Sequence, residues 1–445
     1  MAERIHLISL GCPKNRVDSE VMVGQLRDGP FELVDSPDEA ELIVVNTCSF
    51  IQSATEESID TILDMAQYKN SGSCKKLIVT GCMVQRYGQS LEGELPEVDF
   101  FLGTGEYHRI SEVIANKKPD IRSFIDTPMY IHDEFAPRLP SWKSHSAYLK
   151  ISEGCNHRCA FCIIPTLRGK LRSRSIPSLV AEAQRLASQG VVELNLVSQD
   201  STSYGRDLKD GSDLGKLLRA LARVDGIRWI RLHYAYPIGL PNSLLEAIAE
   251  EEKVCSYIDI PLQHASGPML KRMRRGVTRS GQERILDRIR GAIPNVTVRT
   301  TFIVGFPHET QEDFDILKDF VQQQQFDRVG VFTYSQEDGT EAATMDGQVA
   351  DEVKLQRQEE LMNLQAQISA DRLARHKGET VEVLVDGTSK EHDLVKVGRT
   401  ALQAPDVDGV VFLDKAPENL KAGTFVDVNI TQTTAHDMVG EVVST

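Results

Sequence analysis

The amino-acid sequence predicts an α/β protein in three parts: an N-terminal doubly wound α/β domain, a central partial (β/α)6 barrel and a small C-terminal β-barrel. Three observations lead to this fold class. Up to about residue 130, short apolar strands alternate with helical patterns, as in an open parallel sheet. Six strand–helix units then follow in series, which fits a partial parallel barrel better than an open sheet. The last segment contains only short strand-like stretches and turns.

The composition is that of an ordinary globular protein. The 445 residues are enough for several domains, and 41% of the residues are apolar and 26% charged. No apolar run approaches the roughly 20 residues that cross a bilayer. The first residues also lack the layout of a signal peptide. We therefore expect a cytoplasmic protein with no membrane partner.

Charge and cysteine content narrow the function further. The formal net charge of −15 argues against unspecific nucleic-acid binding, which needs a cationic face, and suits a strongly basic partner. Eight cysteines in a chain of this length are not a disulfide scaffold. Clustered cysteines in a reducing compartment more often bind metal or take part in chemistry.

The N-terminal domain is expected to comprise residues 1–130. Its strands are apolar and its helical patterns follow them directly, which is the order of a doubly wound sheet. The expected strands and helices, in chain order, are Ile5–Leu10, Asp18–Leu26, Leu42–Asn46, Ser53–Tyr68 and Leu77–Thr80.

Three cysteines of this domain, Cys12, Cys48 and Cys82, each follow a predicted strand. The carboxyl ends of strands in an open α/β sheet line one crevice, so three thiolates from distant segments can meet there. The glycines before Cys12 and Cys82 would let the backbone approach a bulky ligand. The alternative is three buried, inert cysteines. Two further cysteines, Cys74 and Cys255, lack this placement and are expected to be structural.

A second group of cysteines, Cys155, Cys159 and Cys162, has the spacing C-x3-C-x2-C just after a strand-like run, Tyr148–Ile151. A 4Fe–4S cluster takes one thiolate per iron, so three ligands leave one iron open for catalysis. The alternative is zinc, whose structural sites usually have four ligands. No fourth ligand is evident nearby, although His157 lies inside the motif.

The central domain, expected over residues 141–376, follows a proline-containing linker at Pro137–Ser141. Its expected strands are Tyr148–Ile151, Val192–Val197, Trp229–Ala235, Tyr257–Pro261, Val296–Val304 and Val329–Tyr334. Its expected helices are Pro177–Ser188, Leu214–Ala222, Pro241–Glu250, Gln282–Ala292 and Gln311–Gln323, with a connector at Asp351–His376. The cysteine motif follows the first strand, where barrels of this kind place their chemistry.

Three polar segments lie on the same side of the predicted barrel. The loop Ser198–Gly205 either holds a ribose or the substrate, or is simply a polar turn. Two basic runs, Arg168–Arg174 and Lys271–Arg275, are either solvated faces or guanidinium partners for a carboxylate on a cofactor or substrate.

Residues 377–445 are expected to form the small β-barrel. Such barrels often bind nucleic acid. From residue 378 onward, however, the sequence contains twelve acidic and five basic residues. The resulting net charge of −7 makes nucleic-acid binding unlikely. Its expected strands are Glu379–Asp386, Val410–Leu413 and Thr424–Thr431.

The C-x3-C-x2-C segment resembles the signature of the radical S-adenosylmethionine (radical SAM) enzymes. The resemblance implies that the open iron chelates the amino and carboxylate groups of SAM. It also implies that Phe161 packs near the adenine of SAM, and that Gly305, which follows the fifth strand, lies beside the same ring.

The whole chain is similar to the methylthiotransferases, radical SAM enzymes with a second 4Fe–4S cluster in the N-terminal domain and a C-terminal TRAM barrel. The resemblance assigns Cys12, Cys48 and Cys82 to that second cluster. Four segments look like the ribosomal-protein branch of the family, RimO: Gly11–Glu20, Glu153–Cys159, Ile163–Pro165 and Pro261–Ala265.

This resemblance implies methylthiolation of the β-carbon of an aspartate in the twelfth protein of the small ribosomal subunit. It also implies two 4Fe–4S clusters, SAM and an electron donor protein. The acidic C-terminal domain would recognise the basic ribosomal protein. Two alternatives stay open: a tRNA (adenosine) methylthiotransferase, and a non-catalytic iron–sulfur or zinc protein.

Overall fold

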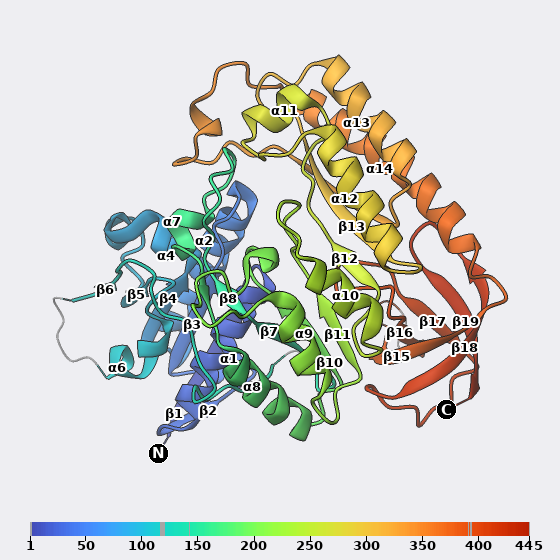
Figure 1. The fold of residues 1–445 in the computed structure, drawn as a ribbon. Coiled ribbons are helices and arrows are strands. Elements are labelled where there is room, and N and C mark those ends of the chain that lie inside the picture. Colours follow the sequence, from blue (N-terminus) through green and yellow to red (C-terminus); the bar gives the residue numbers. More distant parts are fainter. Residues whose placement is uncertain (1, 116–120, 142, 390, 392–393, 445) are drawn as a thin grey trace.

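The computed structural model describes residues 2–444 except 116–120, 142, 390 and 392–393. The N-terminal domain lies at one end of the molecule and the C-terminal barrel at the other, with the central domain between them (Figure 1). In the described residues, no helix is both long and apolar enough to cross a membrane.

The N-terminal domain is an open parallel sheet with strand order β2-β1-β3-β4-β5-β6. Helices α1 and α6 cover one face and α2 and α4 the other, and each face has its own apolar core. The doubly wound prediction is therefore confirmed. The strands are β1 (Glu3–Ser9), β2 (Phe31–Leu33), β3 (Leu42–Thr47), β4 (Lys76–Gly81), β5 (Phe100–Leu102) and β6 (Ser123–Phe124). The helices are α1 (Pro13–Arg27), α2 (Gln52–Ala66), α3 (Tyr68–Ser71), α4 (Cys82–Tyr87), α5 (Leu91–Glu94) and α6 (Ile110–Ile114).

The central domain is a partial parallel barrel, as predicted. Two three-stranded sheets, β7-β10-β11 and β12-β13-β14, are joined by backbone hydrogen bonds between the β11 and β12 segments. The barrel strands are β7 (Ser146–Lys150), β10 (Glu193–Val197), β11 (Trp229–Leu232), β12 (Tyr257–Asp259), β13 (Thr297–Val304) and β14 (Arg328–Thr333). A two-stranded ribbon, β8 (Ser152–Glu153) with β9 (Arg172–Ser173), extends from the end of β7.

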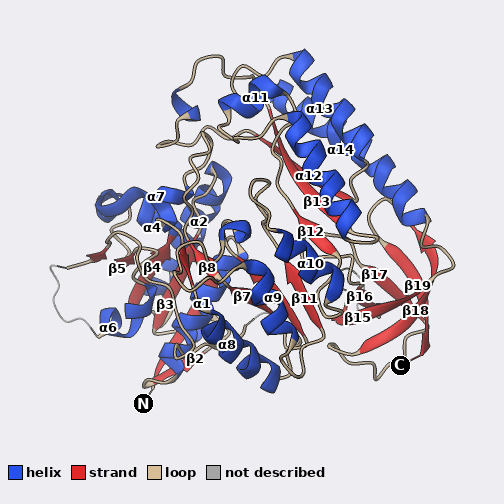
Figure 2. Cartoon of the chain, in the orientation of Figure 1, coloured by secondary structure: helices blue, strands red, loops and turns tan. Residues whose placement is uncertain are grey.

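Helices pack along the outside of these strands and bury one large apolar core between the two layers (Figure 2). The long final helix packs against β14 and leads into the C-terminal barrel. The helices are α7 (Ile164–Arg168), α8 (Ile176–Ser188), α9 (Leu214–Ala222), α10 (Asn242–Glu250), α11 (Gly267–Arg272), α12 (Arg279–Ala292), α13 (Gln311–Gln324) and α14 (Asp351–Ala374).

The C-terminal domain is a closed five-stranded barrel, in the order β15-β16-β17-β19-β18. Two of its strands, β16 and β19, are absent from the sequence prediction. The strands are β15 (Thr380–Thr388), β16 (Lys396–Arg399), β17 (Val411–Asp414), β18 (Phe425–Thr433) and β19 (Met438–Ser444).

The C-terminal barrel closes the amino-terminal end of the central barrel through buried charges. Glu193, at the start of β10, accepts hydrogen bonds from Arg399 of β16 at 2.7 and 3.1 Å and from Arg231 of β11 at 3.3 Å. Arg399 also donates to Asp386 at 2.6 Å. Burial alone would raise the pKa of Glu193, but Arg399 and Arg231 outweigh that effect and lower it to about 2.

The predicted linker at Pro137–Ser141 is extended, but it is not a loose tether. Arg138 within it is 6% exposed and pairs with Glu20 of α1 at 2.6 Å and with Glu182 of α8 at 2.5 Å. The backbone of Pro137 lies against Gly24, where a β-carbon would come within 2.4 Å of the Pro137 oxygen. The segment therefore fastens the N-terminal domain to the barrel.

Replacing Glu193 by Gln should destabilise the protein by about 3–5 kcal/mol at pH 7, because two buried guanidinium groups lose their shared carboxylate. The depressed pKa of Glu193 means that its contribution is complete above about pH 4.5 and is lost as the pH falls toward 2. The free energy of unfolding, measured by chemical denaturation between pH 3 and 8, should therefore fall less steeply with falling pH in Glu193→Gln than in the wild type. Equal pH dependence of the two proteins would contradict this role of Glu193.

Candidate active site

The three cysteines at the N-terminal strand ends lie at one edge of the sheet. Cys12 precedes α1, Cys48 follows β3 and Cys82 begins α4. Gly11 has a φ of +81°, and a β-carbon there would lie 2.6 Å from Cβ and 2.9 Å from Sγ of Cys48. Only glycine fits this close approach. Helix α1 begins at Pro13 rather than at the predicted Asp18, because proline suits the first helical position.

Asn15 and Arg168 hold this group of cysteines together. The Asn15 side chain donates to the carbonyl oxygens of Thr47 at 2.8 Å and Leu10 at 3.2 Å. Nη2 of Arg168 lies 3.4 Å from Sγ of Cys82. Burial raises the pKa of the Cys82 thiol to about 12; Arg168 lowers it, and the nearby thiols of Cys12 and Cys48 add to the rise. The structure therefore brings all three predicted thiols together.

The second triad lies on the loop between β8 and α7, at the carboxyl end of the first barrel strand. The amide of Cys155 donates to the Gly169 oxygen at 3.0 Å, and that of Cys162 donates to the Cys159 oxygen at 3.1 Å. Nη1 of Arg275 lies 3.4 Å from Sγ of Cys159. Burial raises the pKa of Cys155 to about 11 and that of Cys162 to about 12. Thiols protonated in this way lose their protons when they bind metal.

A buried network of four charges joins the two triads across the domain interface. Arg168, which touches Cys82, pairs with Asp18 of α1 at 2.6 Å and with Glu153 at 3.4 Å. Lys150 of β7 pairs with Glu153 at 2.7 Å and also with Asp18. Glu153 stands two residues before the first cysteine of the second triad. The side-chain exposure of all four charged groups is 5% or less.

Apolar packing brings the triads together at the same interface. Cys82 shares a buried cluster with Ile163 and Leu167 of the loop and helix that follow Cys162. On the outer side, Arg86 of α4 pairs with Glu337 of the barrel domain at 2.7 Å. Both triads therefore belong to one site between two domains.

Both triads have the chemistry that an iron–sulfur cluster requires. Each offers three free thiols and one guanidinium within 3.4 Å of a sulfur, and N–H groups directed at cluster thiolates are a known means of tuning such clusters. In the part of the chain that the structure describes, no three His, Cys, Asp or Glu side chains are grouped so as to hold one metal ion. Cluster thiolates each bind a different iron, so they need not converge on one point.

Comparison with known families agrees with this layout. Residues 4–103 match the uncharacterized protein family UPF0004, residues 149–321 the radical SAM superfamily and residues 378–443 the TRAM domain.

Full-length relatives decide the family. The ribosomal protein uS12 methylthiotransferase RimO of Pelobacter propionicus is 49% identical over 99% of this chain and 98% of its own length. That of Geobacter sulfurreducens is 48% identical over 99% of both chains. The chain belongs to the RimO family of radical SAM methylthiotransferases. Among solved structures, the radical SAM methyltransferase TsrM from Kitasatospora setae covers 75% of this chain and 72% of its own, with a TM-score of 0.53 and 14% identity, which supports the fold alone.

The two residues that the radical SAM resemblance assigns to SAM lie near the second triad. Phe161 packs against a buried apolar cluster that includes Phe306, the neighbour of Gly305. Gly305 directly follows β13 with a φ of +71°, and its amide donates to Glu309. A β-carbon there would lie 2.2 Å from Cγ of Lys354 in α14, so packing alone requires glycine at this position. The contact of either residue with SAM stays a prediction.

The loop Ser198–Gly205 and the motif residue His157 form a contact that the sequence did not predict. Nε2 of His157 lies 2.7 Å from Oδ2 of Asp200. The His157 ring stacks on Tyr236, with 3.6 Å between the centroids and 11° between the planes. Asp200 also accepts from Ser203. This loop therefore packs against the cysteine motif and is more than a solvated turn.

The solvated-face interpretation of the basic runs is wrong for three of their arginines. Arg168, Arg174 and Arg275 are only 2%, 4% and 4% exposed. Arg174 pairs with Glu182, while Arg275 donates to the Pro261 oxygen at 2.5 Å. Their partners are protein groups outside the basic runs, which the runs themselves cannot reveal.

Replacing Arg168 by Ala should lower the stability of the metal-free protein by about 3–5 kcal/mol, because Asp18 and Glu153 would then share only Lys150 in a buried site. Chemical denaturation measures this loss. Lys170→Ala, which removes an exposed charge from the same basic run, should change stability by less than about 1 kcal/mol. Equal effects of the two substitutions would contradict the network.

Proposed function

We propose that this protein adds a methylthio group to the β-carbon of an aspartate in ribosomal protein uS12. The observation that carries the proposal is the meeting of two cysteine triads at one interdomain site, linked through Arg168 and Glu153. Relatives that are 48–49% identical over almost their whole length are named for this reaction. A reaction that transfers sulfur to an unactivated carbon needs a radical source and a sulfur donor close together.

In this proposal, Cys155, Cys159 and Cys162 hold the cluster that binds SAM, and Cys12, Cys48 and Cys82 hold a second 4Fe–4S cluster. SAM lies near Phe161 and Gly305. When bound, the cluster on Cys155, Cys159 and Cys162 together with SAM would supply a radical able to take hydrogen from an unactivated carbon. An electron donor protein must reach the second triad, Cys155, Cys159 and Cys162, whose cysteines are all partly exposed.

The protein's own residues orient these groups. Arg275 and Arg168 direct N–H groups at one sulfur of each triad and would stabilise the thiolates there. The charge network of Lys150, Asp18 and Glu153 is buried at the interface of the two domains, with a side-chain exposure of 5% or less for each group, and holds the segments that carry the triads in place.

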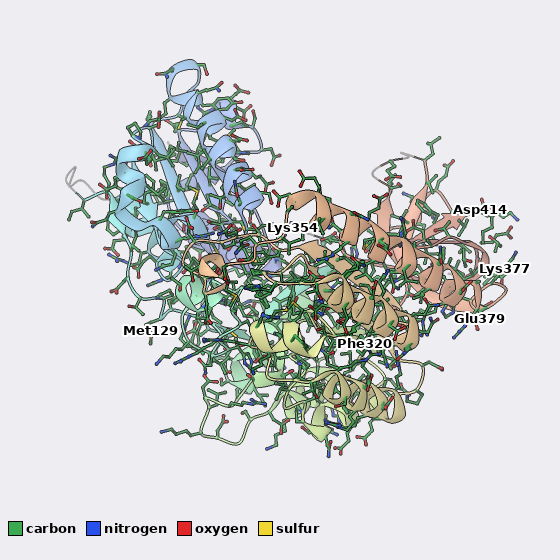
Figure 3. All side chains as sticks on the ribbon, turned by 90° about the horizontal axis from the view of Figure 1, so that it is seen from above. Met129, Phe320, Lys354, Lys377, Glu379 and Asp414 are labelled. Carbon is green, nitrogen blue, oxygen red and sulfur yellow. The ribbon has the colours of Figure 1, made fainter. Side chains whose placement is uncertain are left out.

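The negative charge of the C-terminal barrel supports a basic protein as the partner. Fewer of its acidic side chains are available to that partner than the sequence suggests, because some of them face the rest of the protein. Asp386 and Asp408 face the central domain, where Asp386 lies 3.0 Å from Nε2 of His145 and Asp408 accepts from Tyr257 at 2.8 Å. Other acidic side chains point outward. Figure 3 shows Glu379 and Asp414 at the outer end of this barrel, on the side away from the N-terminal domain.

Ribosomal protein uS12 from cells that lack this gene should be lighter by one methylthio group than uS12 from wild-type cells. The wild-type gene should restore the mass. The variant Cys159→Ala should not, because the cluster that binds SAM loses one of its iron ligands. Intact-mass spectrometry of uS12 measures the difference. An unchanged uS12 mass, together with loss of a methylthiolated adenosine from tRNA, would assign the chain to tRNA instead.

Neutralising the outer acidic surface should weaken binding of uS12. The variant Glu379→Gln, Asp414→Asn, Glu418→Gln should raise the Kd about tenfold at low ionic strength and less at high salt, because each exposed charge contributes a small, screened attraction. Binding titrations at two salt concentrations measure this. Lys377→Gln, which removes a nearby exposed cation, is the control and should not weaken binding. Unchanged affinity of the triple variant at low salt would refute this role of the C-terminal barrel.

A further inference from the structure

Lys14 is a buried cation that the proposed function has not yet used. It lies in the first turn of α1, two residues after Cys12, and is only 8% exposed. Its Nζ stands 3.3 Å from the centroid of the Tyr234 ring, which belongs to the barrel domain. Among the described residues, no carboxylate lies within ion-pair distance of Lys14. The ammonium group thus crosses the domain interface and ends on an aromatic ring.

The neighbouring buried cations differ from Lys14. Lys150 and Arg168 each pair with two carboxylates, and Arg138 does the same in the linker. The ammonium group of Lys14 keeps some contact with solvent but loses part of its hydration, and a ring face compensates only part of that cost. The arrangement would be completed by a bound anion.

The position of Tyr234 is fixed by the groups around it, as is typical of a residue in a binding site. It has a φ of +60°, a conformation that is costly for tyrosine. Its amide donates to Asp259 at 3.1 Å and its carbonyl accepts from Ser201 at 3.0 Å. The residue follows β11, at the carboxyl end of the barrel where the chemistry is expected. The ring packs beside Val17 of α1, so both domains fix its position.

Three anions could face Lys14: the carboxylate of SAM, the second cluster, or the acceptor side chain. The family resemblance places the SAM carboxylate on the open iron of the other triad. The second cluster already has Arg168 beside Cys82, and in the described structure no hydrogen bond joins Nζ of Lys14 to a cysteine sulfur. In the proposed reaction the acceptor carbon must reach both triads, and Lys14 contacts the barrel domain two residues after Cys12 of the first triad.

We propose that Lys14, seated on Tyr234, binds the side-chain carboxylate of the acceptor aspartate. This inference rests on the proposed function. The β-carbon to be modified is bonded directly to that carboxylate carbon, so a fixed cation positions the reacting C–H bond. It also selects the substrate: an asparagine at the acceptor position offers no negative charge and would leave the ammonium group without an anion.

The test uses this protein with both clusters reconstituted and two labelled peptides of uS12 sequence, one with the acceptor aspartate and one with asparagine in its place. Fluorescence anisotropy gives the Kd of each peptide. The wild type should bind the aspartate peptide about tenfold more tightly, the effect of one good charge pair. Lys14→Met and Lys14→Gln should bind both peptides equally, while Lys14→Arg should keep a preference for aspartate.

Lys377→Met, which removes an exposed lysine far from the triads, is the control and should behave like the wild type. Iron content and SAM cleavage to 5′-deoxyadenosine should be the same in all variants. Wild-type discrimination in both Lys14→Met and Lys14→Gln would overturn the inference while leaving the proposed function intact. A changed cluster spectrum with unchanged peptide preference would also overturn it and assign Lys14 to the cluster. Failure of the wild type to bind or modify the aspartate peptide would overturn the proposed function and this inference with it.

Discussion

The buried guanidinium of Arg168 is the interaction on which the site depends. It lies at the end of α7, just after the second cysteine triad, and reaches Cys82 of the first triad, Asp18 of α1 and Glu153 before Cys155. Lys150 pairs with the same two carboxylates from the other side. Removing one member of such a network leaves a buried charge unpaired. Only one relative arrangement of the two domains therefore keeps every charge of the network paired.

The other interfaces follow the same principle. Arg138 fastens the linker to α1 and α8, and Glu193 fastens the C-terminal barrel to the central one. Charge networks contribute less net stability than apolar packing of the same size, but their geometry is specific. That suits an enzyme of the RimO family, in which atoms held by different domains must be placed within one short reaction distance.

The positions of the cysteines could be predicted from sequence because they follow from local rules. Cys12, Cys48 and Cys82 come directly after apolar strands, and the ends of parallel strands share one edge of a sheet. The C-x3-C-x2-C triad needs no long-range contact at all. For the same reason most of the predicted barrel helices agree with the structure to within one residue at each end, as with α9 at Leu214–Ala222. Helix α12 begins three residues before its predicted start, and α7 and α11 are absent from the prediction.

What the sequence could not predict depends on residues that are distant in the chain. Two partners of Arg168, Cys82 and Asp18, come from the other domain, as does the Tyr234 partner of Lys14, so a charge run or a lone lysine gives no sign of burial. Strands β16 and β19 were missed because each contains a glycine, which is uncommon within strands. The closed barrel explains those glycines: a β-carbon at Gly398 would lie 2.5 Å from the Leu384 oxygen, and one at Gly440 would lie 2.4 Å from Val428.

The central claim is that two iron clusters occupy this single interdomain site. Crystals of the anaerobically reconstituted protein, measured at the iron absorption edge, test it most directly. The account predicts two separate compact iron peaks, one bounded by Cys12, Cys48 and Cys82 and the other by Cys155, Cys159 and Cys162, with Arg168 and Glu153 beside them. A single iron peak, or an anomalous signal in either triad that appears only above the zinc edge, would contradict it.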